Sequence, residues 1–208
     1  MTKRTPFAVF NPKERYEKVV VVGGGDSAVK HLEAIRCFLE RSSSVAIVFA
    51  TARFAREYFG LSCPKYYILV GSEAQRMEKN LRGNSFDDCC ILPPSPHVMG
   101  VEVPSFAVDK TFELENVEFT DEFLDSCTTI AIATADLLSD KVYLVGYDGY
   151  YGQVLSEKEA TLTAENRKIF ESYQHHSGKQ LVSFFPTLYG IKVQSVYHFL
   201  LEKERDEK

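Results

Sequence analysis

Short runs of β-branched residues alternate with helical patterns along the first half of the chain. Lys18–Val22 and Val45–Phe49 are runs of the kind that suits a strand buried on both faces. Tyr66–Val70 and Cys89–Leu92 have the same character. Between the first two runs, apolar residues recur at helical spacing with charged residues on the opposite side. Strands that alternate with helices over short connections predict βαβ units and a parallel sheet.

The second half is less regular. Residues 93–120 contain four prolines and scattered hydrophobic residues without a clear period, which is typical of a covering excursion or a functional loop. Lys141–Gly146 predicts a further central strand. The other predicted elements are a helix over 121–138, a helix over 157–173, a strand over 181–185 and a closing amphipathic segment over 193–201.

We therefore predict one α/β domain, a three-layer Rossmann-like fold with a mostly parallel sheet, over residues 18–201. An N-terminal extension over residues 1–17 precedes it, and a charged tail over 202–208 follows it. A length of 208 residues suffices for one good-sized core, and there is no internal repeat or low-complexity linker that would suggest a second domain.

The composition and charge of the chain limit the kinds of molecule that it is expected to bind and the compartment in which it is expected to lie. The chain is 45% hydrophobic and 25% charged, which is ordinary for a globular protein. A net charge of -5, without a Lys/Arg run longer than two residues, argues against nucleic acid as a partner. Residues 1–17 lack the apolar core of a signal peptide, and no window is apolar enough for a membrane span. Five cysteines without a CxxC pair predict a reducing, cytoplasmic location.

A glycine-rich turn, residues 22–28 (VGGGDSA), joins the first strand to the first helix. The backbone N–H groups and the helix dipole at such a junction favour an anion. Gly23, Gly25 and Ala28 match the G-x-G-x-x-[GA] spacing of dinucleotide-binding folds. The second strand, however, ends in residues 49–53 (FATAR), without a carboxylate for a ribose. Three interpretations stay open: a nucleotide or other anionic ligand, NAD(P) with Arg53 on a 2′-phosphate, or a tight turn whose glycines supply backbone freedom.

A second turn, Gly146–Gly152, follows the predicted central strand. Ligands of parallel sheets bind beyond the carboxyl ends of the strands, so Asp148 is expected there with tyrosines around it, ready to hold a sugar or a base. The alternative is an Asp-Gly turn whose tyrosines pack the rim. The predicted ligand-binding residues are Gly23, Gly24, Gly25, Asp26, Ser27, Thr51, Asp148 and Tyr150.

Among the histidines, His31 is predicted to be a solvated helix residue, whereas His97 is predicted to reach an active site from the long loop. The pair at 175–176 is expected to stabilise a helix C-terminus. No grouping of His, Cys and Asp has metal-ligand spacing, so neither a metal nor a cofactor is predicted.

Three segments carry a family resemblance. Residues 19–28 (VVVVGGGDSA) and the stretch 121–149, ending in KVYLVGYDG, resemble bacterial sialyltransferases of glycosyltransferase family 42 and related motility-accessory-type proteins. A closer resemblance is to the domain that follows the HMG-CoA-lyase-like barrel in aldolases of surface-sugar gene clusters (4-hydroxy-2-oxovalerate aldolase type). Its G-[FY]-D-G-Y and S-[LF]-x-P-T-x-Y-x-I motifs are present here at 146–150 and 183–191.

The resemblance implies an accessory domain of surface-carbohydrate, acidic-sugar biosynthesis that binds a nucleotide or nucleotide-sugar and has an aldolase barrel as its partner. One alternative is a CMP-sugar-dependent glycosyltransferase in which His97 or His175 replaces the family's lid histidine. Another is an interaction domain without a ligand, forming a homodimer through residues 93–120. The sequence departs from the sialyltransferase pattern at Gly24 and Asp26, where those enzymes have Asn and Pro, and at Ala50–Thr51, where they have a nucleotide-binding asparagine.

Overall fold

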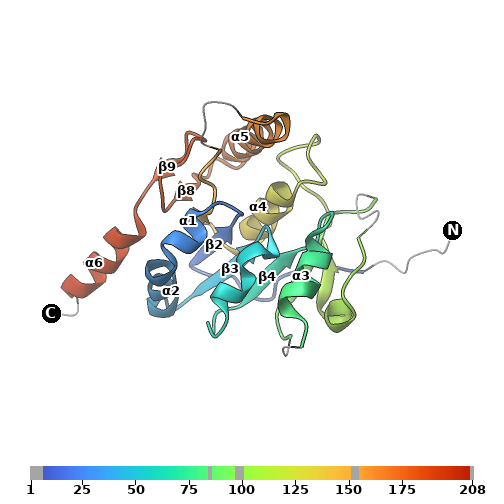
Figure 1. Ribbon diagram of the computed structural model, residues 1–208, viewed down its shortest axis with the longest axis horizontal. Helices are drawn as coiled ribbons and strands as arrows, with labels where there is room; N and C mark the ends of the chain where they lie inside the picture. The colour runs from blue at the N-terminus through green and yellow to red at the C-terminus, as the bar shows by residue number, and fades with distance from the viewer. Residues whose placement is uncertain (1–6, 84–85, 97–100, 151–154, 207–208) are drawn as a thin grey trace.

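The strands of the described chain form one sheet in which every neighbouring pair is parallel. The computed structural model describes residues 7–83, 86–96, 101–150 and 155–206. The sheet order is β1-β6-β5-β4-β3-β2-β7-β8-β9. Figure 1 labels β2, β3, β4, β8 and β9 of this sheet. The strands are β1 Ala8–Val9, β2 Lys18–Val22, β3 Val45–Phe49, β4 Lys65–Ile68, β5 Cys89–Leu92, β6 Thr111–Glu113, β7 Val142–Val145, β8 Val182–Ser183 and β9 Lys192–Val193.

Helices cover both faces of this sheet, which confirms the predicted three-layer, Rossmann-like fold. The α-helices are α1 Ser27–Lys30, α2 Leu32–Arg41, α3 Glu73–Leu81, α4 Cys127–Leu138, α5 Glu157–Ser177 and α6 Val196–Asp206. Two 3₁₀ helices, η1 Ala52–Tyr58 and η2 Ser105–Lys110, complete the layers. Among the helices of the described residues, none is both long enough and apolar enough to cross a membrane.

The central strand β2 shows why its sequence is apolar at consecutive positions. Val20 and Val22 pack with α2, η1 and α3 on one face, whereas Val19 and Val21 pack with α4 and α5 on the other. All four valines are fully buried. Because successive side chains of a strand point to opposite faces, a strand covered on both sides needs a continuous apolar run.

Helix α4 lies directly against the sheet and also contacts α5. Its sequence, CTTIAIATADLL, is apolar around most of its circumference, as a helix buried on several sides requires. The buried Thr134 hydroxyl is satisfied within the helix, because it donates to the carbonyl oxygen of Ile130 at 2.7 Å. The position of α4 is therefore fixed by packing along its length, and its N-terminus is held at one edge of the sheet.

The predicted excursion at 93–120 is partly regular. It supplies η2 and strand β6, and β6 pairs with both β5 and β1. Strand β1 comes from the segment that we predicted to be an N-terminal extension, so residues far apart in sequence build one end of the sheet. At the other end of the chain, α6 continues to Asp206, into the predicted tail, and packs against α2.

Several predicted boundaries shift. The predicted helix at 121–138 begins only at Cys127, because Phe123 and Leu124 reach the core from irregular backbone before it. The predicted strand at 181–185 keeps only Val182–Ser183, because the Ser183 hydroxyl donates to the Phe185 carbonyl and turns the chain away. A capping box between Ser156 and Glu159, which sequence analysis missed, starts α5.

Candidate functional site

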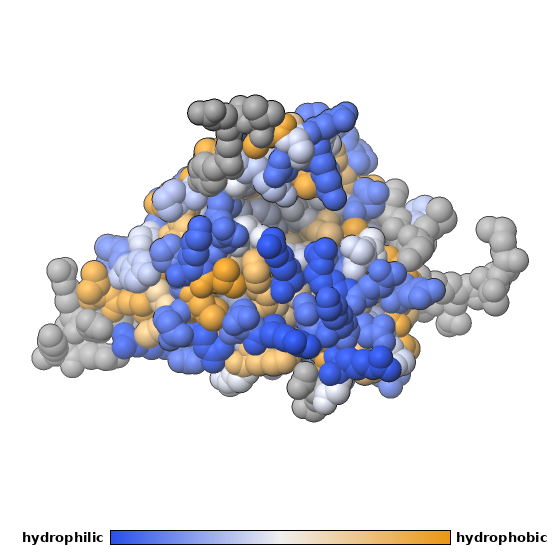
Figure 2. All heavy atoms as spheres, viewed as in Figure 1, coloured by the Kyte–Doolittle hydropathy of each residue, from blue (hydrophilic) through white to orange (hydrophobic). Residues whose placement is uncertain are grey.

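A cleft of about 680 Å³ opens at the carboxyl ends of β2, β3 and β7. The sheet order reverses direction at β2, which is the topological switch point where open α/β sheets bind ligands. We call it the main cleft; its walls are the glycine turn, residues 50–53, residues 146–150 and the N-terminal parts of α4 and α5. In the space-filling view, a recess bordered by both hydrophilic and hydrophobic residues lies between the upper part of the molecule and the body below it (Figure 2).

The glycine turn is packed tightly against the end of β7. A Cβ atom at Gly23 would lie 2.6 Å from the Gly146 carbonyl oxygen, and one at Gly25 would lie 2.7 Å from Asp148 Oδ2. Neither glycine has a positive φ. These two positions therefore need glycine for close approach, not for backbone freedom. Gly24 differs, because its Cβ would only touch the Thr51 methyl at 3.6 Å, and it faces the main cleft.

Most N–H groups of this turn are already bonded within the protein. Gly23 and Gly25 donate to the carbonyl oxygens of Val145 and Gly146, each at 2.8 Å. The Ser27 amide donates to Asp148 Oδ2 at 2.9 Å. Asp148 therefore lies where the sequence analysis placed it, beside the glycine turn, but its carboxylate already occupies the anion position at the start of α1.

Thr51 and two arginines form the wall next to Gly24. The Arg53 guanidinium donates to the Gly24 carbonyl oxygen at 3.0 Å, and Arg76 Nη1 donates to Thr51 Oγ1 at 2.9 Å. Arg76 also pairs with the buried carboxylate of Glu73, which accepts a hydrogen bond from the Ala52 amide at 2.8 Å. Arg53 has no carboxylate partner among the described residues, so its charge is available to an anionic ligand.

The opposite wall is the N-terminus of α4. Its N-cap residue, Ser126, does not cap it and instead donates its hydroxyl to Glu165 Oε1 on α5, at 2.6 Å. The first turn of α4 contains no acidic residue. Because Ser126, Cys127 and Thr128 line the main cleft, the N–H groups and the positive dipole end of a 12-residue helix open toward it.

The Tyr147 hydroxyl lies beside this helix terminus. It is buried and forms no hydrogen bond of ordinary geometry within the described residues, although the tyrosine lines the main cleft. Burial raises the pKa of Tyr147, and Thr128, which approaches the hydroxyl, offsets part of that rise. Burial also raises the pKa of the Cys127 thiol to about 12, so that cysteine is a neutral group in the wall. The Tyr147 hydroxyl is therefore an enclosed group of the wall, not one that is exposed to the cleft.

The predicted residues divide between two clefts. Gly23, Gly24, Gly25, Thr51, Asp148 and Tyr150 all line the main cleft. Asp26 and Ser27 line a neighbouring second cleft, in which Asp26 pairs with Lys30 at 3.3 Å. Ser27 contributes structurally, because its hydroxyl accepts a hydrogen bond from the Gly146 amide at 3.0 Å.

Sequence analysis missed Arg76, Glu165 and the start of α4 as parts of the site, whereas Tyr147 is one of the tyrosines that it expected around Asp148. The sequence contained no signal for that terminus, because the predicted helix began at 121 and its first turn contains Asp121 and Glu122. The others lie on elements whose apposition depends on the sheet order.

The histidine predictions have different outcomes. His31 is not a freely solvated residue, because its ring stacks on Phe185 at 4.4 Å between centroids and its Nδ1 lies 3.1 Å from the Tyr197 hydroxyl. His175 lies in the last turn of α5, roughly 14 Å along the helix from the cleft residue Asn166 at 1.5 Å per residue. His97 and Tyr151 lie outside the described residues. Within the described residues, no group of three or more His, Cys, Asp and Glu could hold a metal ion.

The fold is similar to that of the MAf glycosyltransferase from Magnetospirillum magneticum AMB-1. The TM-score is 0.61 and the sequence identity 11%, over 92% of this chain. This chain spans 36% of the length of that glycosyltransferase chain. No protein-family model and no curated protein matches the sequence. The similarity establishes that the two proteins share a fold.

Proposed function

We propose that this chain binds a nucleotide or nucleotide-sugar in the main cleft, as an accessory domain of acidic-sugar, surface-carbohydrate biosynthesis. The observation that carries the proposal is the convergence of two groups on that cleft: the Arg53 guanidinium, which no carboxylate of the described residues pairs with, and the start of α4, which no side chain caps. Both favour an anion such as a phosphate group.

The two sides of the main cleft suit different parts of such a ligand. Phosphate would lie between Arg53 and the start of α4, where the positive charge and the N–H groups are. The base or sugar would lie against Tyr150 and Tyr189, and the hydroxyl of Tyr189 is close enough to accept a hydrogen bond from Asn166, at 3.4 Å. The glycine turn then contributes a surface of close approach at Gly24, not an amide cradle.

Isothermal titration calorimetry with CMP, CMP-sialic acid and UDP-sugars tests this proposal. Arg53→Gln is expected to weaken binding about tenfold, because a charge-assisted hydrogen bond contributes about 1.4 kcal/mol or more. Arg15→Gln, on an exposed arginine bonded to Asp140, is the matched control and should bind as wild type does. The absence of binding across the whole panel would refute the proposal.

A second candidate is a CMP-sugar-dependent glycosyltransferase, which the fold shared with the MAf glycosyltransferase favours. Of the two histidines that could have served as base, His175 does not line the main cleft. Glu165 does line it, and its carboxylate could accept a proton from an acceptor hydroxyl. Release of CMP from CMP-sialic acid, present in wild type and lost in Glu165→Gln with CMP affinity retained, would support this candidate; no turnover by wild type would remove it.

The aldolase partner remains a prediction from sequence resemblance. It is tested by mixing the chain with a purified HMG-CoA-lyase-like barrel and measuring the mass of the product by analytical ultracentrifugation. A mass equal to one chain, both alone and in the mixture, would also count against the homodimer alternative.

A further inference from the structure

The last strand of the sheet, β9, has an open outer edge within the described part of the chain, where it pairs only with β8. The Gln194 amide donates to the Ser183 carbonyl oxygen of β8 at 2.9 Å. Because the backbone groups of successive residues in a strand point to alternate sides, the N–H and C=O groups of Val193 point away from β8, toward the open edge. An edge of this kind is a template for pairing with another strand.

The residues around this edge also expose apolar side chains. Val193 is 47% exposed, as is Tyr197 on α6, and Leu201 on the same helix is 60% exposed. Tyr197 and Leu201 are four residues apart, so they are neighbours on one side of α6. Val196 and Phe199 pack toward the core instead and hold the helix on the sheet. From β9 the chain continues into α6 at the left end of the molecule (Figure 1), so this end has an apolar surface of the kind that is typical of a protein interface.

A second copy of the chain fits this edge, because the sequence around Val193 is complementary to itself. If two β9 strands run antiparallel and are centred on Val193, the two Val193 residues exchange both of their outward N–H···O=C hydrogen bonds. Lys192 of each copy then lies opposite Gln194 of the other, so no like charges are opposed. Every contact is made twice, which is the condition for an isologous interface that closes as a dimer.

We propose that this chain forms a twofold-symmetric dimer through β9, in which the sheets of two copies join into one continuous sheet. A twofold axis perpendicular to the sheet places both α6 helices on the same face of the joined sheet, on either side of the junction. This surface differs from the predicted dimer contact at residues 93–120. Neither β9 nor α6 lines the main cleft, so the inference does not depend on the ligand proposed above.

Sedimentation equilibrium of the full chain over a range of protein concentrations tests this proposal. Wild type should approach the mass of two chains as the concentration rises. Val193→Pro, which removes the outward N–H group, should weaken the dimer at least tenfold. Val9→Pro is the matched control, because Val9 is an exposed valine on the opposite edge strand, β1, where Phe10 donates inward to the Glu113 carbonyl oxygen. This variant should dimerise as wild type does.

Charge and cross-linking test the register of the two strands. Gln194→Glu places a carboxylate opposite Lys192 of the second copy and should strengthen the dimer, whereas Gln194→Lys opposes two lysines and should weaken it, each at least threefold. Val193→Cys should form an intermolecular disulfide under mild oxidation, because facing residues of a hydrogen-bonded pair have Cα atoms about 5.5 Å apart. Wild type and Val9→Cys should not form one.

A wild-type mass of one chain at every concentration would refute the dimer. A dimer that Val193→Pro and Gln194→Lys both leave intact, without a disulfide in Val193→Cys, would refute the β9 contact, because the dimer would then use another surface. If circular dichroism shows that Val193→Pro does not fold, the two Gln194 variants decide, and equal dimer affinities for them would overturn the proposal. Loss of the dimer in a folded Val9→Pro would assign the contact to the opposite edge and would also overturn it.

Discussion

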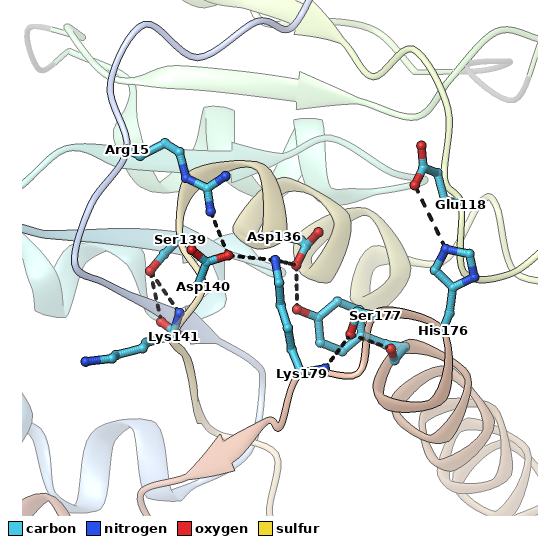
Figure 3. A network of polar contacts seen from close by, with 10 residues as sticks. Arg15, Glu118, Asp136, Ser139, Asp140, Lys141, His176, Ser177 and Lys179 are labelled. Atoms are coloured by element: carbon cyan, nitrogen blue, oxygen red, sulfur yellow. Dashed lines mark hydrogen bonds and ion pairs between the residues drawn. The ribbon is translucent and has the colours of Figure 1, made fainter.

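At their C-terminal ends, α4 and α5 hold a network of charged groups that pair with one another (Figure 3). At their N-terminal ends the same helices line the main cleft, where the Ser126 hydroxyl is bonded to Glu165 but no side chain caps the first N–H groups of α4. In the first region, Lys179 pairs with Asp136 at 2.8 Å and Asp140 at 2.9 Å. The Tyr173 hydroxyl donates to Asp136 at 2.6 Å, and Arg15 donates to Asp140 at 2.9 Å.

The difference between these two regions separates polar groups that stabilise the fold from polar groups that line the main cleft. The network in Figure 3 links the segment before β2, the end of α4 and the turn after α5, so its charges compensate one another within the fold. Near the cleft, Tyr147 is buried like Tyr173, but its hydroxyl has no hydrogen-bond partner of ordinary geometry in the described residues. The two tyrosines therefore differ in how their buried hydroxyls are satisfied within the fold.

The largest expected effect concerns the wall of the cleft itself. Gly23→Ala should lower the free energy of unfolding by about 1–3 kcal/mol, because its Cβ would lie 2.6 Å from a backbone oxygen that cannot move aside. Gly24→Ala is the matched control and should change stability by less than about 0.5 kcal/mol, because its Cβ makes only an ordinary contact. Urea unfolding of the two variants measures both. Equal losses would contradict the packing that we describe for the turn.

Removing one tyrosine hydroxyl near each end of the α4–α5 pair tests the comparison between the two regions most directly. Tyr173→Phe should destabilise the protein by about 1–2 kcal/mol, since it leaves Asp136 without one of its hydrogen bonds. Tyr147→Phe removes a hydroxyl without a partner, so stability should stay the same or rise by up to about 1 kcal/mol. Thermal and urea unfolding give the two signs. A loss at Tyr147 as large as that at Tyr173 would show that its hydroxyl is already satisfied.

The smallest expected effect is a pH dependence confined to the paired end. Although partial burial opposes it, the carboxylates of Asp136 and Asp140 raise the pKa of Lys179, and burial and Asp136 raise the pKa of Tyr173. A group whose pKa is raised by folding stabilises the folded state fully at pH values below its unfolded-state pKa. This contribution is lost as the pH rises through its folded-state pKa. Stability should therefore fall above about pH 10.

Lys179→Met tests this loss of stability at alkaline pH, because it should reduce the loss by about 0.5 kcal/mol.

At acid pH the dependence of stability on pH has the opposite sign. Lys179 and Arg15 lower the pKa of Asp140, so its contribution is present above about pH 4 and is lost as pH falls further. Chemical unfolding at a series of pH values measures the loss of stability at both alkaline and acid pH. Lys168→Met is the control for removing one exposed lysine. A wild-type curve that is flat up to pH 11 would contradict the coupling at Lys179.

Local sequence determined the strands and the class of fold. Lys18–Val22, Val45–Phe49 and Cys89–Leu92 occur as predicted, because a strand covered on both faces requires an apolar run whatever its neighbours are. It also predicted that Asp148 and the glycine turn would meet, since both follow strands of one parallel sheet and carboxyl ends share an edge.

Tertiary structure alone decided how the polar groups of that edge are used. The sequence contains the same Gly-Gly-Gly-Asp turn whether its amides hold a ligand or Asp148, and only the order β3-β2-β7 brings Asp148 onto the Ser27 amide. The Tyr147 hydroxyl, Ser126 and Glu165 come from segments whose contact depends on how α4 and α5 pack. Hydrogen bonds between distant segments leave no periodic trace in a sequence, so pairing and its absence become visible only in the folded chain.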